Sequence, residues 1–199
     1  MSVYHFSLPL SEADVRKLRV NDVVYVSGIM VTARDQAHRR ALEWAQKGQA
    51  LPVNLEGSAV FHCGPVMRKE DESWVAVAAG PTTSTRMDVY EDQFLEAFKP
   101  RIIVGKGGMG KRTTRAMEKV GAVYCAFTGG AAVLAAQAIK RVLGVEWLDL
   151  GMPEAMWVLE AVEFGPLVVA IDSHGNNLFA ENSAKVEANL QRIYEQFGL

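Results

Sequence analysis

Cysteine is scarce in this chain: Cys63 and Cys125 are the only two among its 199 residues. Two thiols far apart in sequence do not supply the roughly three or four thiolates that an iron–sulfur cluster normally takes. Ligand pairs at the spacings Cys-x2-Cys, His-x3-His or Glu-x2-His are also missing. A disulfide between the two cysteines stays possible, although nothing in the chain requires one. We therefore predict that the chain holds no metal centre by itself.

Net charge is also small, at −2 from 21 basic and 23 acidic residues. A chain without a strong basic field has little to attract nucleic acid or an acidic membrane surface. Its first residues lack a basic stretch followed by a long apolar run, so we expect no secretory signal and a cytoplasmic location. Residues 121–139 carry no charge, but Gly129-Gly130 and three polar side chains interrupt them, which favours a buried strand, a turn and a helix over a membrane span.

The length and the lack of repeats, low-complexity tracts and charge blocks indicate one domain covering residues 1–199. Alternating apolar patterns predict strands and helices in turn along the second half, which is typical of parallel βαβ units. We expect an α/β fold with mixed sheet layers and flanking helices. The expected strands are 22–31, 58–63, 74–79, 101–104, 122–127, 145–148, 156–162 and 167–171. The expected helices are 35–46, 111–119, 131–141 and one from a cap at Asn182 or Ser183 to about Phe197.

Two polar loops follow strand-like runs and stand out from the rest of the chain. The first is 80–88, with four consecutive hydroxyl side chains from Thr82 that end on Arg86. The second is 104–111, in which Gly105 and Gly107 flank Lys106. Glycines at a strand end let backbone N–H groups approach an anion, and the cationic side chains add charge. The alternatives are an ordinary polar turn for the first loop and a solvated lysine in the second. We instead expect two anion-binding loops and a ligand with two anionic groups.

The glycine loop also comes close to two nucleotide motifs. Gly105-x-Gly107-x-x-Gly110 fits the dinucleotide pattern, but the next strand ends in Thr128-Gly129-Gly130 rather than in an acidic residue. As a P-loop, the segment has Arg112 where a Ser or Thr should hold magnesium. A stand-alone phosphate- or nucleotide-binding module therefore remains an alternative function.

A third polar segment lies where the strand 22–31 leads into the helix 35–46. Asp35 is there either as a helix N-cap or as part of a site. Arg34 would lie at a strand end, where open α/β sheets bind ligands, and His38 would lie one helical turn further on the same face. Residues 172–177 are typical of a turn, and we expect His174 in it to be structural.

Taken in order, these segments resemble the C-terminal half of class I, iron–sulfur-dependent fumarases, and the resemblance covers nearly the whole chain. In two-subunit members that half is a separate β chain, and the L-tartrate dehydratase β subunit belongs to the same group. The matching segments are Ala33-Arg34-Asp35-x-x-His38-Arg39-Arg40, His62-x-Gly64-Pro65, Gly80-Pro81-Thr82-Thr83-Ser84, Arg86-Met87, 104–110, Gly151-Met152-Pro153-Glu154, 163–167 and Ile171-Asp172.

The resemblance implies a swivelling β/β/α domain that closes over a [4Fe-4S] cluster held by a partner α subunit, in an α2β2-type assembly. One iron would act as a Lewis acid on the substrate hydroxyl. The implied activity is reversible hydration of fumarate to (S)-malate, with L(+)-tartrate dehydration to oxaloacetate as the alternative. The residue that distinguishes the two substrates would lie near Thr85. A non-catalytic regulatory subunit is a third possibility.

Residue by residue, the resemblance implies that Arg34, Arg86 and Lys106 bind the two carboxylates of a four-carbon dicarboxylate. Thr82 would be the base that removes a proton next to a carboxylate. A threonine hydroxyl is a poor base at neutral pH, so it needs nearby cations such as Arg86 and Lys106 to lower its pKa. His38 would relay protons or orient Arg34.

Overall fold

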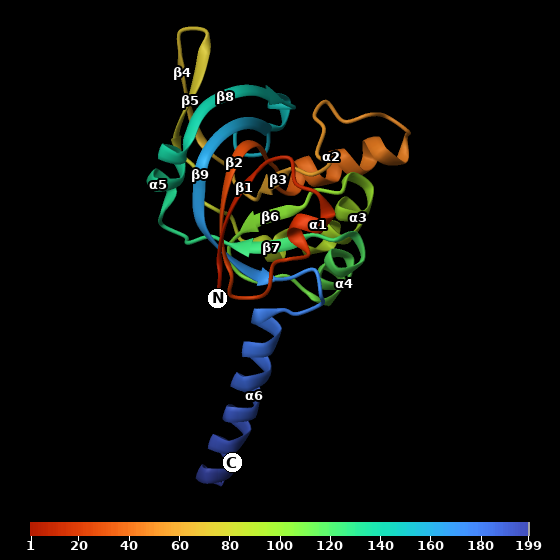
Figure 1. The fold of residues 1–199 in the computed structure, drawn as a ribbon, viewed down its shortest axis with the longest axis vertical. Coiled ribbons are helices and arrows are strands. Elements are labelled where there is room, and N and C mark those ends of the chain that lie inside the picture. Colours follow the sequence, from red (N-terminus) through yellow and green to blue (C-terminus); the bar gives the residue numbers. More distant parts are fainter. Residues whose placement is uncertain (199) are drawn as a thin grey trace.

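The computed structural model describes residues 1–198, which form one seven-stranded sheet, a separate two-stranded hairpin and flanking helices (Figure 1). The strands of the large sheet lie in the order β1-β2-β3-β6-β7-β9-β8, and the first five run parallel. Their bounds are β1 Val3–Ser7, β2 Val23–Thr32, β3 Ala59–Phe61, β6 Ile102–Gly105 and β7 Val123–Ala126, followed by the antiparallel β8 Ile139–Glu146 and β9 Met156–Ile171.

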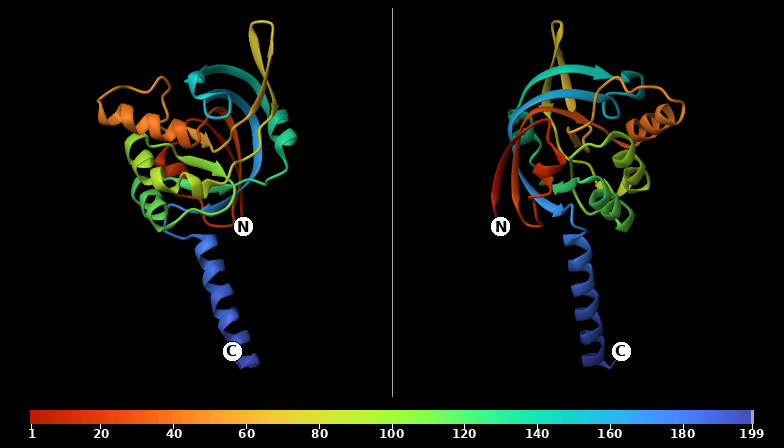
Figure 2. Two further views of the ribbon diagram at one scale, coloured as in Figure 1. Left: turned by 180° about the vertical axis from the view of Figure 1, so that it is seen from behind. Right: turned by 45° about the vertical axis from the view of Figure 1, so that its right-hand side comes forward.

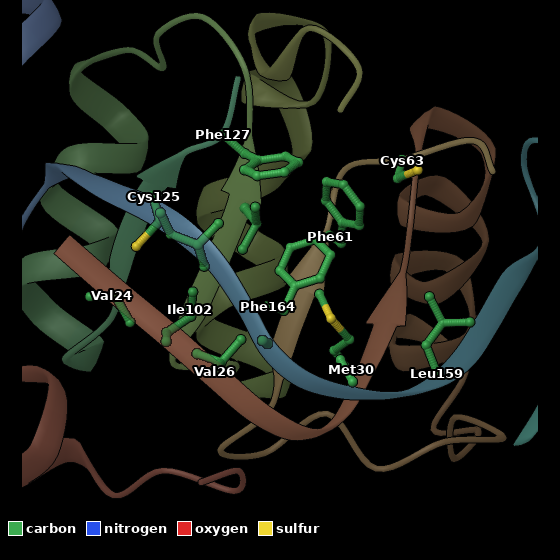
Figure 3. Close-up of a cluster of buried hydrophobic side chains, with 14 of the residues drawn as sticks. Val24, Val26, Met30, Phe61, Cys63, Ile102, Cys125, Phe127, Leu159 and Phe164 are labelled. Atoms are coloured by element: carbon green, nitrogen blue, oxygen red, sulfur yellow. The ribbon is translucent and has the colours of Figure 1, made fainter. Parts of the chain in front are cut away.

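Strand β9 also pairs antiparallel with β2, so strands β2, β3, β6, β7 and β9 form a closed ring. One core cluster fills this ring (Figure 3), where Phe61 of β3, Phe127 and Phe164 of β9 pack with their ring centroids 5.2–6.2 Å apart. Because side chains alternate along a strand, the neighbouring residues of the parallel strands face outwards. They form a second core with the helices that cover that side.

Three helices cover the outer face of the parallel strands, namely α2 Asp35–Gln46, α3 Asp88–Phe98 and α4 Lys111–Val120. They lie in the order α2, α3, α4 beside one another, and α5 (Ala132–Ala138) lies near β5, β8 and β9 instead (Figure 2). The remaining elements are α1 Glu12–Val15, the hairpin strands β4 Val66–Glu70 and β5 Ser73–Ala78, the 3-10 turns η1 Ser84–Arg86 and η2 Leu148–Leu150, and α6 Leu178–Phe197.

Helix α6 projects away from the rest of the molecule (Figure 1). Asn177 caps it by accepting hydrogen bonds from the backbone N–H groups of Phe179 and Ala180. Its apolar side chains are largely exposed, including Val186 and Phe197. Neither α6 nor any other helix of residues 1–198 is long and apolar enough to cross a membrane.

The predicted mixed α/β fold with flanking helices is confirmed, and β2, α2, β6 and α4 lie within one residue of their expected bounds. The prediction of a helix over 131–141 is wrong at its end, because the β-branched residues from Ile139 onwards pair with β9. The strands expected at 156–162 and 167–171 are one long strand. The last helix begins at Leu178, since Asn177 is the cap rather than Asn182 or Ser183.

Candidate functional site

The two predicted anion-binding loops lie side by side at the carboxyl ends of the parallel strands. The backbone N–H of Thr82 donates to the carbonyl of His62, just beyond β3, at 2.7 Å. The N–H of Lys106, just beyond β6, donates to the carbonyl of Thr82 at 3.3 Å, and Ser84 N donates to Lys106 O at 2.9 Å. Open α/β sheets bind ligands at this edge, so the topology brings the hydroxyl loop and the glycine loop to a suitable place.

Carboxylates hold both arginines of the predicted site. Arg86 in η1 donates from Nε and Nη2 to the two carboxylate oxygens of Asp35, at 3.1 and 2.5 Å. Of the two readings left open for Asp35, the helix N-cap is excluded, because Arg34 is the cap residue and Asp35 opens the helix. Arg34 Nε lies 3.1 Å from Glu154 Oε1, while Glu154 Oε2 accepts a hydrogen bond from the Gln36 N–H at 2.9 Å. Paired guanidinium groups keep their orientation and retain further N–H donors for a ligand.

Gly64 has a steric reason to be glycine. A Cβ at this position would lie 2.3 Å from Arg34 Nη1 and 2.9 Å from Pro153. Any larger residue would therefore displace Arg34, which is only 19% exposed.

Lys106 differs from the two arginines because its side chain is exposed and forms no ion pair within residues 1–198. Its stem passes Gly129, where an added Cβ would lie 3.5 Å from Lys106 Cδ. An unpaired ammonium beside a loop of backbone N–H groups can bind an anion without first breaking another interaction.

The glycine loop has the strand–loop–helix context of a phosphate site, but its helix end is already filled. Asp88 Oδ1 accepts hydrogen bonds from Gly110 N at 2.8 Å and from Thr113 Oγ1 at 2.6 Å. A carboxylate thus lies at the N-terminus of α4, where a bound phosphate would be expected. A Cβ on Gly110 would come 2.6 Å from Asp88, so this glycine makes room for a side chain. These contacts argue against the nucleotide-binding alternative.

Of the two glycines predicted to contact substrate, only Gly107 needs a left-handed backbone, with a φ of +74°. Gly105 instead makes room for buried side chains, since a Cβ there would lie 1.9 Å from Ser84 Oγ. Thr85, near which the residue that distinguishes the two substrates is predicted to lie, donates from Oγ1 to the carbonyl of Gly108 at 2.8 Å and so connects the two loops. The substrate contacts of these residues remain predictions.

His38 lies where its spacing predicts, one turn beyond Arg34, and its Nδ1 is 2.8 Å from the carbonyl oxygen of Arg34. The ring is fully buried, and its Nε2 faces Glu91 at 3.4 Å. These contacts suit a residue that orients Arg34, while proton relay by His38 stays a prediction. His174 lies in the expected turn after β9 with Nε2 2.9 Å from the carbonyl of Arg16, as expected of a structural residue.

Sequence reasoning missed Glu91 and Glu154, the two carboxylates that support the predicted arginine and histidine. Glu91 lies on α3, a helix that no pattern in the chain led us to expect. Glu154 belongs to the segment Gly151-Met152-Pro153-Glu154, which carries the resemblance but drew no residue-level assignment. His62, in the segment His62-x-Gly64-Pro65, also drew no residue-level assignment. Its Nε2 lies 3.1 Å from Glu91 Oε2.

Neither cysteine fits a cluster ligand. Cys63 and Cys125 are fully buried and are not joined in a disulfide. Burial raises the pKa of each thiol to about 12, and for Cys63 the charge of Arg34 acts in the opposite direction without outweighing burial. Both are protonated at neutral pH, whereas the ligand form of cysteine is the thiolate.

Comparison with known proteins gives consistent results. A family model described as "Fumarase C-terminus" matches residues 4–182. The chain is 47% identical over 185 residues to a Methanocaldococcus jannaschii protein named "Putative L(+)-tartrate dehydratase subunit beta", covering 92% of this chain and 95% of that protein. It is 46% identical over 188 residues to the L(+)-tartrate dehydratase subunit beta of Escherichia coli (strain K12), covering 94% and 92% of the two chains. It is also 43% identical over 171 residues to a Geobacillus stearothermophilus protein named "Putative fumarate hydratase class I", covering 85% of this chain and 32% of that longer protein.

Proposed function

This chain belongs to the fumarase C-terminus family, and from that premise we propose that it is the β subunit of a two-subunit hydro-lyase acting on a four-carbon dicarboxylate. The observation that supports the proposal best is that Arg34, Arg86 and Lys106 all lie at the carboxyl ends of the strands, beside the hydroxyl loop. Three cations suit a ligand with two carboxylates.

In the proposed reaction, the two guanidinium groups and the ammonium bind the substrate carboxylates and fix the orientation of the carbon chain. In the dehydration direction, deprotonated Thr82 Oγ takes the proton from the carbon next to a carboxylate, and the electron pair of that C–H bond forms the C=C bond as the hydroxyl leaves the neighbouring carbon as hydroxide. The proton on Thr82 then passes to the hydroxide, which yields water and restores the base. Negative charge develops on the carboxylate as the proton leaves. Fixed N–H donors in a site of this kind stabilise such charge more in the transition state than in the ground state.

The reaction we predict from the sequence is hydration of fumarate to (S)-malate. Dehydration of L(+)-tartrate to oxaloacetate is the second candidate, favoured by the names of the relatives at 46–47% identity. The two reactions differ by one substrate hydroxyl. A site built to hydrogen-bond that hydroxyl can discriminate strongly between the two substrates.

A [4Fe-4S] cluster is implied by the family, but the residues of this chain do not fit one, because both thiols are buried and protonated. The proposal therefore assigns the cluster to an α subunit, and it includes an α2β2 assembly. The name "subunit beta" of the relatives supports such a partner. Buried free thiols fit a reducing compartment, which supports the cytoplasmic location that we propose.

The test is anaerobic co-expression of the chain with a candidate α subunit, followed by assays of fumarate hydration and L(+)-tartrate dehydration. We expect activity on one of these substrates only when both chains are present, and at least about 100-fold lower kcat/KM for Arg86→Ala. Activity of the α subunit alone at the full rate would contradict the proposal. Binding of ATP or NAD to this chain, measured calorimetrically with magnesium, would favour the nucleotide alternative instead.

A further inference from the structure

Three ionisable side chains with no contact to solvent meet behind the candidate site. His38 comes from α2, His62 from the end of β3 and Glu91 from α3, and all three are 0% exposed. Glu91 Oε2 lies 3.4 Å from His38 Nε2 and 3.1 Å from His62 Nε2. Burying a carboxylate away from water is costly unless it is paired, so a cluster of this kind in a core calls for an explanation.

The outer nitrogens of the two rings connect this cluster to the site. His38 Nδ1 donates to the carbonyl oxygen of Arg34, an atom that only accepts. His62 Nδ1 lies 2.9 Å from Ser84 Oγ, which accepts a hydrogen bond from the Tyr124 hydroxyl at 3.0 Å. The same hydroxyl lies 2.9 Å from the carbonyl oxygen of Gly107 in the glycine loop.

Burial raises the pKa of Glu91, but the facing rings of His62 and His38 lower it to about 2, so the group is ionised. Burial lowers the pKa of His62, although the Glu91 carboxylate opposes this effect. On the other side of the ring, the Nδ1 of a neutral His62 accepts from the Ser84 hydroxyl, and the single Tyr124 hydroxyl proton is shared between Ser84 Oγ and the carbonyl oxygen of Gly107. Between the rings, both Nε2 atoms and both Glu91 oxygens lie close together but form no hydrogen bond within residues 1–198.

We propose that Glu91 is a positioning residue of the enzyme: through the two histidines it fixes the backbone of Arg34, the hydroxyl loop 82–86 and the glycine loop 105–108 relative to one another. This inference rests on the proposed function, which assigns substrate contacts to those three segments. Glu91 itself touches none of the predicted substrate contacts. It holds the substrate-binding groups of these three segments at fixed positions relative to one another. A misplacement of such groups by about 1 Å can lower the rate about 100-fold.

A bound metal ion is the competing explanation, because the three ligand atoms lie within 4.8 Å of one another. Within residues 1–198 the group comprises only these three residues, whereas a structural zinc site is closed by four ligands. Because the atoms between the rings form no hydrogen bond within residues 1–198, the metal content of the chain has to be measured to separate the two explanations.

The test uses Glu91→Gln in the reconstituted two-subunit enzyme, with Asp22→Asn as the matched control. Asp22 is also a buried carboxylate, but it accepts from the N–H groups of Ser2 and Arg19, near the N-terminus. We expect both variants to lower the melting temperature. Glu91→Gln alone should lower kcat/KM by at least about 10-fold and raise KM, since misplaced cations bind the carboxylates less well. Loss of folded protein reduces apparent kcat but leaves KM unchanged, so KM separates positioning from stability.

Ser84→Ala provides a second variant in case Glu91→Gln fails to fold, because it removes one hydroxyl from the same chain and should raise KM too. Unchanged KM in every folded variant, beside an active wild type, would overturn the inference while leaving the proposed function intact. A wild-type complex inactive on both substrates would overturn the proposed function and the inference with it. Stoichiometric metal in the isolated chain that disappears in Glu91→Gln would identify a metal site and also overturn the inference.

Discussion

Substitution of Gly105 by alanine should destabilise the protein far more than its position in a loop motif suggests. The added Cβ would lie 1.9 Å from Ser84 Oγ and 3.3 Å from His62 Nδ1, so Ser84 has to move. Overpacking of a well-packed core costs about 1–3 kcal/mol. Displacing Ser84 also breaks its buried hydrogen bonds to His62 and Tyr124, each worth about 1–3 kcal/mol when a partner is left unsatisfied.

A combined loss of about 3 kcal/mol or more in the free energy of unfolding is therefore expected for Gly105→Ala. For a chain of this size each kcal/mol lowers the melting temperature by about 2–4 °C, so we expect a decrease of about 6–12 °C. Thermal unfolding of the purified chain, followed by far-UV circular dichroism, measures this directly. The matched control is Gly144→Ala in β8, where a Cβ meets nothing within 4 Å. It should change stability by no more than about 0.5 kcal/mol.

A double variant, Gly105→Ala with Ser84→Ala, tests the cause as well as the size of the effect. Removing the serine hydroxyl leaves only contacts of 3.3 Å at the new methyl group. The double variant should be more stable than the sum of the single effects predicts, by at least about 1 kcal/mol. Additive effects, or a Gly105→Ala melting temperature within 2 °C of the Gly144→Ala control (about 1 kcal/mol or less), would refute the packing argument. They would leave substrate contact as the reason for this glycine.

Three further outcomes are expected. Lys106→Ala should lower kcat/KM of the reconstituted enzyme by at least about 100-fold, the scale of a lost transition-state donor. The control Arg112→Ala breaks a surface ion pair with an aspartate and should change kcat/KM by no more than about 2-fold. Equal effects of the two substitutions would contradict the assignment of Lys106 to the site. Thr82→Val should reduce kcat more than substrate binding, and equal losses in both would count against a base. The melting temperature should fall as pH drops below 6.5, the ordinary pKa of the buried neutral His62, and further below 4.5, that of the ionised Glu91. In both cases the unfolded chain binds the proton more readily, and a melting temperature that is flat from pH 8 to pH 4 would contradict these charge states.

Local patterns were sufficient to predict the elements that carry most of the candidate site. The β-branched run before Thr32 and the polar–apolar periodicity of residues 35–46 predict β2 and α2, and the structure agrees with both. Since β3 and β6 are parallel neighbours, their carboxyl ends lie at one edge of the sheet. The hydroxyl loop follows the hairpin strand β5 and reaches this edge through single bridges from Pro81 to Cys63 and from Thr83 to Lys106, which no local pattern predicts.

The supporting residues could not be predicted because their partners are distant in sequence. Glu154 pairs with Arg34, and Glu91 lies against His62, only because the folded chain packs these distant segments together. A carboxylate on an amphipathic helix is usually solvated, so nothing local marks Glu91 as buried. The alanine-rich stretch before Ile139 has helical propensity, but pairing with β9 decides its last residues.

Strand β9 determines when this protein can fold. It hydrogen-bonds with β2 near the start of the chain and with β7 and β8 shortly before it, so the ring of strands cannot close until residue 171 has been synthesised. Until then, β2 and β7 expose edges that can pair with other chains. Contacts over so long a stretch of sequence make folding slow, and the incomplete chain is prone to aggregate. We therefore expect the yield of folded protein to rise when the nascent chain is protected until β9 has been made.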